Sequence, residues 1–526
     1  MELTGKNIIG STLSNESHAP FFGEDPATGN RIEPAFYEAS EREINEAIQK
    51  ADEAFPLYRN KTGKERAAFL EAIAEELLAL DHQLILRAME ESGLPEARLT
   101  GERGRTAGQL RLFAQLLREG SWVDARIDRA DPERRPLPKP DIRSMQKALG
   151  PVGVFGASNF PLAFSVAGGD TVAALAAGCP VVFKAHPAHP GTCELAGRAI
   201  QSAAIRTHMP EGTFSMVQGK STAVGLAIVR HPLIKAIGFT GSFAGGRALL
   251  DEANKRPEPI PVYAEMGSSN PVFILPRILK EKGEKIARDL SASVTLGVGQ
   301  FCTNPGLVFT EQSGQEQAFR ERLSRHVTEL SAGVMLSSGI RNNYHRGLEK
   351  VSALEGVTVL AKGKQEGAGY RGTPSLLHAT AAAFLQQHEL EEEVFGPSTL
   401  VLTAGNKDEL LQAARRLRGH LTATIHGTEE DLAEYAQLVS ILEQKVGRVL
   451  INGYPTGVEV CAAMVHGGPY PATTDGRSSS VGTLAIHRFT RPVCYQDFPQ
   501  SLLPEELKEE NPLGIWRLVN GERKNN

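Results

Sequence analysis

The stretch Val152-Gly153-Val154-Phe155-Gly156-Ala157-Ser158-Asn159-Phe160-Pro161 begins the part of the chain that decides the fold. Its apolar beginning predicts a short buried strand, and its polar end lies where that strand stops. An alanine-rich helix is expected next, over residues 161–177, and it ends at Gly178-Cys179-Pro180 because glycine and proline terminate helices. A second buried strand is expected at 181–184.

The same alternation of strands and helices continues beyond residue 184. We expect further helices at 192–206, 221–230 and 243–254, and further strands at 213–217, 234–239, 260–265 and 271–275. Strands that alternate with helices are typical of a parallel sheet covered by helices on both faces. We therefore predict an α/β protein with a doubly wound, mostly parallel sheet, in which ligands bind beyond the carboxyl ends of the strands.

Composition excludes several classes of protein. The chain has 526 residues, of which 41% are hydrophobic and 23% charged, as in ordinary globular proteins. A net charge of −5 gives no indication of nucleic-acid or membrane-surface binding. We see neither a transmembrane run nor a signal peptide, and the five cysteines show no paired spacing. A cytoplasmic protein without a nucleic-acid or membrane partner is therefore expected.

A single cysteine lies in the small, polar stretch Leu296-Gly297-Val298-Gly299-Gln300-Phe301-Cys302-Thr303-Asn304-Pro305-Gly306. Taken alone, a loop cysteine of this kind is more often an ordinary residue than a nucleophile. The ends of four predicted strands change this interpretation, because polar or glycine residues follow each apolar run. Those residues are Asn159, Lys184, Gly241-Ser242 and Glu265.

These side chains match the needs of a thiolate that attacks a carbonyl group. Such a thiolate requires donors for the oxyanion and a base that removes the covalent intermediate. The amide of Asn159 and the backbone N–H of Cys302 are the predicted donors. Partial burial is expected to raise the pKa of Glu265 towards that of a useful general base. Because none of these segments contains a histidine, a cysteine–histidine arrangement is not predicted.

Two further motifs bear on ligands. The glycine-rich turn 241–246 lies at a helix start, where free N–H groups favour a pyrophosphate, although the same pattern fits a tight strand–helix turn equally well. His186 and His189 have a spacing open to a metal ion, but prolines break the helix that would bring them together. No metal is predicted.

The combined motifs resemble the aldehyde dehydrogenase superfamily over most of the chain, from about residue 20 to 498. The resemblance implies a cysteine thioester mechanism in which Cys302 is the nucleophile, Asn159 the oxyanion donor and Glu265 the base. It rests on motifs in family order: Asn159-Phe160-Pro161, Phe183-Lys184, Phe239-Thr240-Gly241-Ser242 with Gly246, Glu265-Met266-Gly267, Gly299-Gln300-Phe301-Cys302 and Glu393-Val394-Phe395-Gly396-Pro397.

The resemblance also implies a dinucleotide cofactor. Pro187 replaces a glutamate that NAD-preferring members commonly carry, and losing that carboxylate admits a 2′-phosphate, so NADP is predicted, with NAD as the second candidate. Lys184, His186 and Lys220 are expected to balance the phosphate charge. The usual lysine after the Glu265 motif is absent, since Ser268-Ser269 stands there. The implied cofactor-binding residues are Lys184, His186, Lys220, Gly241, Ser242, Gly246, Glu393 and Phe395.

Three structural units follow from the same resemblance. They are an NAD(P)-binding domain (1–127 and 150–256), an α/β catalytic domain (257–470) and a small β oligomerisation domain (128–149 and 478–498), followed by a C-terminal tail (499–526). Segment 480–486 is β-prone and is expected to form an edge strand that pairs with another subunit. We expect a homodimer or homotetramer.

The departures from the common motifs look like the branch that contains 2-oxoglutarate semialdehyde (2,5-dioxovalerate) dehydrogenases. NADP-dependent oxidation of 2,5-dioxovalerate to 2-oxoglutarate is the leading interpretation. A long-chain aldehyde dehydrogenase is the alternative on the same scaffold. A dianionic product calls for arginines near the tunnel, but Arg103, Arg105 and Arg111 lie on a helix, where arginines are usually solvated. A cofactor-free thiol hydrolase and a non-catalytic nucleotide-binding protein are the candidates from other classes.

Overall fold

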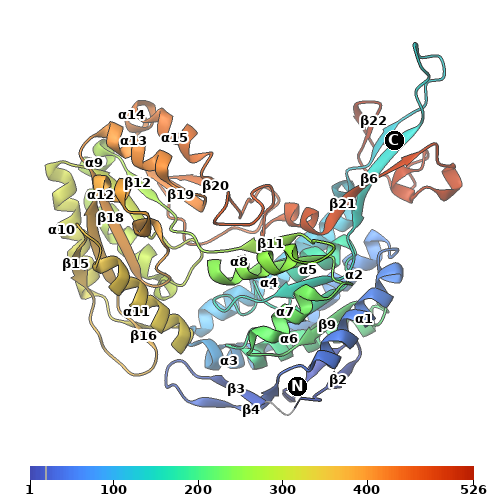
Figure 1. Ribbon diagram of the computed structural model, residues 1–526, viewed down its shortest axis with the longest axis horizontal. Coiled ribbons are helices and arrows are strands. Elements are labelled where there is room, and N and C mark those ends of the chain that lie inside the picture. The colour runs from blue at the N-terminus through green and yellow to red at the C-terminus, as the bar shows by residue number, and fades with distance from the viewer. Residues whose placement is uncertain (18–19, 526) are drawn as a thin grey trace.

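Two seven-stranded sheets form the body of the protein, as the computed structural model of residues 1–17 and 20–525 shows (Figure 1). The first sheet has the order β11-β10-β7-β8-β9-β1-β2, and the first five strands in this order run parallel to one another. The predicted parallel α/β sheet is confirmed. Its strands are β11 (Val262–Glu265), β10 (Ala236–Thr240), β7 (Val152–Phe155), β8 (Val181–Lys184), β9 (Phe214–Val217), β1 (Asn7–Ile9) and β2 (Thr12–Ser14).

Helices cover both faces of this sheet. Successive residues of a strand point to opposite faces, so the buried strands are apolar on both sides. In β8, Val181 and Phe183 pack into one apolar cluster, which includes residues of α2, α3, α4, α5 and α6. Val182 packs into a second cluster, with residues of α1, α7 and α8. The helices are α1 (Glu41–Tyr58), α2 (Gly63–Ala79), α3 (Asp81–Ser92), α4 (Glu96–Glu119), α5 (Gly169–Ala177), α6 (Pro190–Arg206), α7 (Thr222–Arg230) and α8 (Phe243–Asn254).

The helix expected over 161–177 begins only at Gly169, so the start of that prediction is wrong. The buried carboxylate of Glu102 accepts hydrogen bonds from the backbone N–H groups of Leu162 and Ala163, at 2.9 and 3.0 Å. Gly168 also lies so close to the backbone that an added Cβ would be 2.4 Å from the carbonyl oxygen of Ala163. The segment therefore runs as a series of turns above the sheet.

The second sheet lies on the other side of the molecule (Figure 1). Its order is β15-β17-β18-β13-β12-β19-β20, and all neighbours are parallel except β15 and β17. The strand predicted at 271–275 belongs here, as β12, and not to the first sheet. The strands are β15 (Thr358–Lys362), β17 (Ser375–Thr380), β18 (Ser398–Ala404), β13 (Leu307–Glu311), β12 (Val272–Ile274), β19 (His420–His426) and β20 (Val446–Ile451).

Helices also cover the second sheet, with one apolar cluster on each side. They are α9 (Pro276–Thr295), α10 (Gly314–Glu329), α11 (Ser338–Ser352), α12 (Ala381–Gln386), α13 (Lys407–Arg416), α14 (Glu429–Glu434) and α15 (Ala436–Leu442). Two small sheets, β3 (Pro20–Glu24) with β4 (Arg31–Tyr37) and β14 (Gly333–Val334) with β16 (Arg371–Gly372), complete this part. Within the described residues, we find no helix that has both the length and the apolar character of a membrane span.

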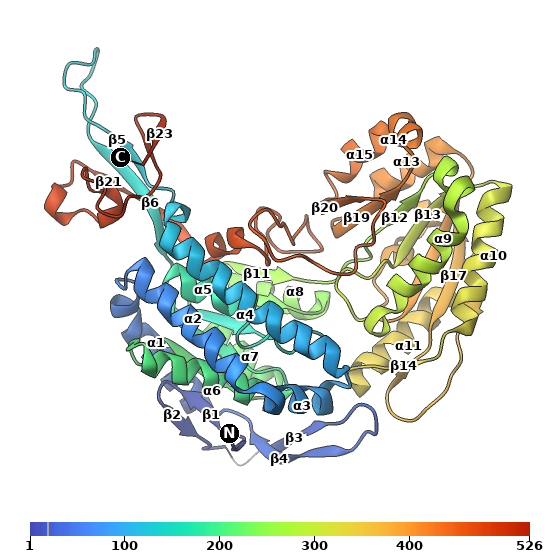
Figure 2. The same cartoon turned by 180° about the vertical axis from the view of Figure 1, so that it is seen from behind.

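A five-stranded sheet projects from the body (Figure 2). The expected edge strand at 480–486 is wrong, because residues 483–489 form a 3-10 helix in which Ala485, Ile486 and Phe489 are buried against the first sheet's helices. The strand follows it, and the tail beyond 499 adds two more strands. The order is β21 (Thr490–Gln496), β6 (Ile142–Ala148), β5 (Arg126–Asp128), β22 (Arg517–Val519) and β23 (Glu522–Lys524).

Candidate active site

The loop that carries Cys302 is shaped by a left-handed turn. Gly297, Val298 and Gly299 have φ angles of 55°, 59° and 65°. Glycine is required at position 299, because an added Cβ would be 2.2 Å from the carbonyl oxygen of Gly396. Val298 adopts a conformation that β-branched residues rarely take, which is the kind of strain found at functional sites.

A buried amide holds this loop on the second sheet. The side chain of Asn270, which precedes β12, donates to the carbonyl oxygens of Cys302 and Asn304, both at 2.9 Å. The Asn270 side chain is fully buried, so these hydrogen bonds are shielded from water. We did not identify this residue from the sequence, although a polar residue directly before a buried strand was the available signal.

Cys302, His466 and Glu265 lie together although they are distant in the sequence. Cys302 Sγ is 3.4 Å from His466 Nε2, and the same nitrogen is 3.1 Å from Glu265 Oε1. Ser480 Oγ donates to the other carboxylate oxygen of Glu265 at 2.6 Å. The histidine and the glutamate are each 1% exposed. The prediction that no histidine accompanies the cysteine is therefore wrong.

The charges of this cluster differ from those expected. Burial alone would raise the pKa of Glu265, but His466 and the hydroxyl of Ser480 outweigh it and hold that pKa at about 2. The expected rise in the pKa of Glu265 is wrong for this reason. Burial and the negative charge of Glu265 raise the pKa of Cys302 well above its ordinary value. The resting cysteine is a thiol that must give its proton to a neighbour when it attacks.

Cys302 and Glu265 face the same nitrogen of His466, Nε2. A catalytic triad uses both ring nitrogens, one for the nucleophile and one for the carboxylate. Here, Nε2 alone faces both the sulfur and the carboxylate, so the three groups form a compact cluster and not a relay. The prediction that the chain uses no metal stays a prediction, since thiol, imidazole and carboxylate atoms that zinc accepts lie within 4.8 Å of one another.

Asn159 lies beside the nucleophile loop. Its side-chain Nδ2 donates to the backbone carbonyl oxygen of Gln300 at 3.0 Å, and its backbone carbonyl oxygen accepts from Arg98 at 3.1 Å. One amide hydrogen of Asn159 is left over. Within the described residues, the backbone N–H of Cys302 donates to no acceptor. Both groups meet the requirement for oxyanion donors that are not already engaged.

The carboxyl end of the first sheet fits a dinucleotide. Residues 241–244 are exposed at the start of α8. Ser242 Oγ accepts from Gly245 N at 3.2 Å, and the other free N–H groups of the first helical turn remain open to an anion. Gly246 packs so closely on Met266 that an added Cβ would be 2.6 Å from its Cγ. The helix start can therefore lie directly over the strand ends.

Lys184 lies at the end of β8 in the same region. Its Nζ donates to the carbonyl oxygen of Gly219 at 2.6 Å, and burial lowers its pKa to about 8. The exposed Lys220 and the adjacent Ser221 donate their backbone N–H groups to the Glu38 carboxylate, each at 2.8 Å. The sequence analysis did not predict that the Glu38 carboxylate lies at the start of α7, beside Lys220 and Ser221.

His186 does not carry the charge assigned to it. Its ring is stacked on His189, with centroids 5.2 Å apart, and its Nδ1 accepts the N–H of Ala188. Burial, together with the charges of His189 and Lys184, lowers the pKa of His186 far below its usual value. The structure therefore does not support a charged His186, and its role beside a 2′-phosphate stays a prediction.

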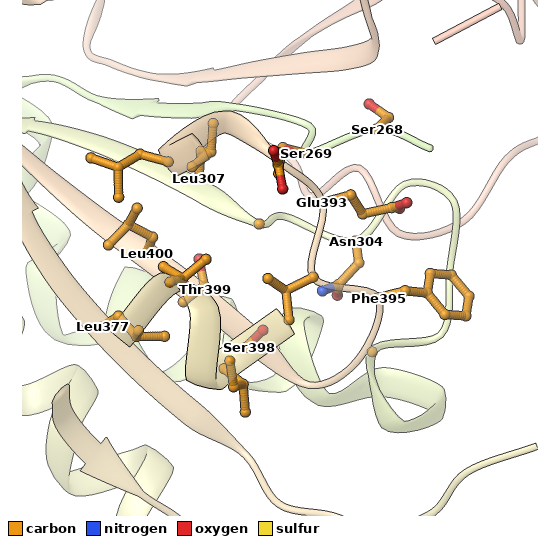
Figure 3. A pocket seen from close by; sticks show the side chains of 17 residues that line it. Ser268, Ser269, Asn304, Leu307, Leu377, Glu393, Phe395, Ser398, Thr399 and Leu400 are labelled. Carbon is orange, nitrogen blue, oxygen red and sulfur yellow. The ribbon is translucent and has the colours of Figure 1, made fainter. Parts of the chain in front are cut away.

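Glu393 and Phe395 line a pocket in the second sheet's half of the molecule, with Ser268 and Asn304 nearby (Figure 3). The Glu393 carboxylate lies against Gly267, where an added Cβ would be 2.2 Å from Oε2. Its charge contributes to the raised pKa of Cys302. The structure thus places Glu393 beside Gly267, in the segment that follows Glu265.

A second pocket lies in front of Cys302 and is lined by Arg98 and Arg105 of α4. The interpretation of the α4 arginines as a solvated face is wrong for Arg105. It lies between the aromatic rings of Phe160 and Phe164, 5.5 and 5.4 Å from their centroids. The next arginine back along the helix, Arg103, pairs with Asp81 instead.

Comparisons with known proteins agree with this geometry. Residues 14–491 match the model of the aldehyde dehydrogenase family. The chain is 50% identical over 522 residues to alpha-ketoglutaric semialdehyde dehydrogenase 2 of Azospirillum brasilense, with 99% of each chain covered. It is 49% identical over 487 residues to alpha-ketoglutaric semialdehyde dehydrogenase of Acinetobacter baylyi, with 92% of each covered. A Bacillus cereus aldehyde dehydrogenase in complex with NAD+ has the same fold, with a TM-score of 0.79 at 22% identity, over 93% of this chain and 96% of that one.

Proposed function

Because the chain belongs to the aldehyde dehydrogenase family, we propose that it oxidises 2,5-dioxovalerate to 2-oxoglutarate through a thioester on Cys302, with NADP as the cofactor. The observation that carries the proposal is the position of Cys302, between Asn159 and the Glu265–His466 pair. The names of the two relatives that are about half identical support this substrate. Comparing turnover of 2,5-dioxovalerate with that of decanal tests the choice against a long-chain aldehyde.

The first step is attack of the thiol on the aldehyde carbon. Sγ forms a bond to carbon as its proton passes to the Glu265–His466 pair, whose shared nitrogen is 3.4 Å from the sulfur. The negative charge that develops on the aldehyde oxygen is stabilised by the Asn159 amide and the Cys302 N–H. Loss of a hydride from this carbon converts the adduct into a thioester. A bound NAD(P) would supply the hydride acceptor, and Lys184, Gly241, Ser242, Gly246, Glu393 and Phe395 are the residues that would hold it.

The second step is hydrolysis of the thioester. The Glu265–His466 pair first releases the thiol proton to solvent. Water then attacks the acyl carbon and gives a proton to the pair, the carbon–sulfur bond breaks, and the pair returns a proton to the departing sulfur. A carboxylate with a pKa near 2 is a weak base when alone. Because the two groups share one hydrogen bond, they take up a proton as a unit, and Ser480 keeps the carboxylate oriented.

The proximity of His466 to Cys302 also fits a cofactor-free thiol hydrolase. The open start of α8 and the position of Lys184 favour a dinucleotide enzyme over this candidate and over a non-catalytic nucleotide-binding protein. The readout that separates them is simple. The proposed enzyme consumes an aldehyde and reduces NAD(P), whereas a hydrolase cleaves esters but leaves aldehydes unchanged and a binding protein lacks turnover.

NADP is proposed because a carboxylate is absent at position 187 and because Glu38 is already engaged by donors at the start of α7. Pro187→Glu should lower kcat/KM for NADP more than for NAD, since the new charge repels a 2′-phosphate. Pro187→Gln is the matched control, because it also removes the proline but adds no charge. A wild-type preference of a hundredfold for NAD in kcat/KM would refute the charge argument.

We propose that residues 1–127 with 150–256, 257–470, and 128–149 with 478–498 form most of the cofactor, catalytic and oligomerisation units. The bounds need two corrections, because β11 pairs in the first sheet and β22 and β23 belong to the projecting sheet. Among the edge strands of the three larger sheets are β20 in the second sheet and β21 in the projecting sheet. Each presents unpaired backbone groups that another subunit can cover. A homodimer or homotetramer is expected, and static light scattering that finds only monomer at micromolar concentration would contradict it.

A cytoplasmic location is proposed from the cysteines. All five are unpaired, and Cys302 must stay reduced to act as a nucleophile.

A further inference from the structure

The pocket in front of Cys302 contains more positive than negative charge on its substrate side. Arg98 and Arg105 both line it, and Glu102 is the acidic residue between them on α4. The Glu102 carboxylate is itself occupied, because Oε1 accepts two backbone N–H groups. One guanidinium charge is therefore left without a matching carboxylate on this wall.

Arg98 is the arginine that Glu102 balances. Its Nη2 lies 3.7 Å from Glu102 Oε2 and also donates to the carbonyl oxygen of Asn159. Its guanidinium is held between two aromatic rings, 4.7 Å from the centroids of Phe160 and of Phe301. Arg98 is thus fixed in place by the protein and has a structural role beside the predicted oxyanion donor.

Arg105 has no such partners. Its Nε and Nη2 are buried, and neither has a hydrogen-bond acceptor within the described residues. Burial lowers the pKa of this guanidinium, and the nearby negative charge of Glu102 works against that lowering. Burying charged N–H groups without an acceptor costs free energy, and the protein supplies no acceptor for these groups of Arg105.

We propose that Arg105 binds the distal carboxylate of the substrate, and that the enzyme therefore selects short aldehydes that carry a carboxylate group. This inference rests on the proposed aldehyde oxidation. Arg105 lines the pocket in front of Cys302, and a guanidinium offers pairs of N–H groups that match the two oxygens of a carboxylate. The rings of Phe160 and Phe164 hold the guanidinium at the pocket wall.

Arg105 could act differently, by stabilising the thiolate of Cys302, whose pKa its charge lowers. The two roles predict different patterns. A residue that assists the thiolate affects every aldehyde equally, whereas a residue that binds a carboxylate affects only aldehydes that have one. Succinic semialdehyde and butanal provide a matched pair, since they have the same number of carbons and differ in the distal group.

The test is kcat/KM for both aldehydes in the wild type and in Arg105→Gln, Arg105→Lys and Arg103→Gln. Arg105→Gln should lower kcat/KM for succinic semialdehyde and 2,5-dioxovalerate about 10- to 100-fold, mainly through KM, the range expected for a lost charge-assisted pair. Its effect on butanal should be less than threefold. Arg105→Lys keeps the charge but not the paired N–H edge, so it should recover part of the loss. Arg103→Gln, on the same helix, should change neither substrate.

Equal losses for succinic semialdehyde and butanal in Arg105→Gln would overturn the proposal, as would an unchanged kcat/KM for the carboxylate-bearing substrates. If Arg105→Gln does not fold, as judged by thermal melting, the Arg105→Lys comparison decides in the same way. A wild type that oxidises butanal but not succinic semialdehyde also overturns it while leaving aldehyde oxidation intact. A wild type that oxidises no aldehyde refutes the proposed function itself.

Discussion

Cys302→Ala is expected to abolish aldehyde oxidation and ester hydrolysis together. Both reactions need an acyl–sulfur intermediate, and Sγ of Cys302 is the sulfur that lies beside the Glu265–His466 pair. Alanine fills nearly the same space, so the hydrogen bonds from Asn270 to the loop backbone should persist. Turnover should therefore fall to background while the protein stays folded, measured by absorbance at 340 nm and by thermal melting.

Cys461→Ala is the matched control, because Cys461 is also partly exposed and unpaired but lies in another loop. It should retain full activity. Substantial aldehyde turnover by Cys302→Ala would contradict the assignment, because it would require a second nucleophile.

Glu265→Gln is expected to separate the two chemical steps. His466 Nε2 remains 3.4 Å from the thiol and can take its proton, so the first acylation should still occur. Water attack on the thioester then lacks the charged member of the pair, and steady-state turnover should fall by about 10²–10⁴. Rapid mixing should show a burst of about one reduced cofactor per active site, the stoichiometry of a single acylation, followed by slow turnover.

Ser480→Ala tests the same assignment with a smaller change. It removes one hydrogen bond to Glu265 but leaves the carboxylate, so it should keep both the burst and most of the steady-state rate. If Glu265→Gln shows no burst while Cys302 still reacts with iodoacetamide, Glu265 is needed to activate the thiol, and the role given to it in hydrolysis is refuted.

The local pattern of the chain predicts the first sheet well. Apolar runs such as those of β7 and β8, separated by helical segments, leave few arrangements other than parallel strands covered on both faces. Which sheet a strand joins depends on distant partners. β12 follows β11 closely in sequence, yet pairs with β13 and β19, and no local signal contains that information. The same limitation explains why segment 480–486 was mistaken for an edge strand.

The site shows the same division. The sequence reveals Asn159 and Glu265 because each lies at the end of an apolar run, and it reveals Cys302 because a reactive thiol lies in a small, polar stretch. His466 does not. It reaches the site through long-range pairing, in which Met266 N donates to the Ala472 carbonyl oxygen at 2.7 Å, and nothing near residue 466 indicates that contact.

Charge was predicted less well than position. The expected rise in the pKa of Glu265 followed from burial alone, and the unseen histidine reversed its sign. The pKa of His186 also differs from the expectation, because burial and the charges of His189 and Lys184 lower it. Electrostatic predictions need the partners from distant segments, which the sequence alone does not place.

The most direct test follows 2,5-dioxovalerate in the wild-type enzyme with NADP and, separately, with NAD. Absorbance at 340 nm should rise, and the amount of reduced cofactor should equal the amount of 2-oxoglutarate formed, with NADP used at least as well as NAD. Absence of any increase with either cofactor, or aldehyde consumption without reduced cofactor, would contradict dinucleotide-linked oxidation at Cys302.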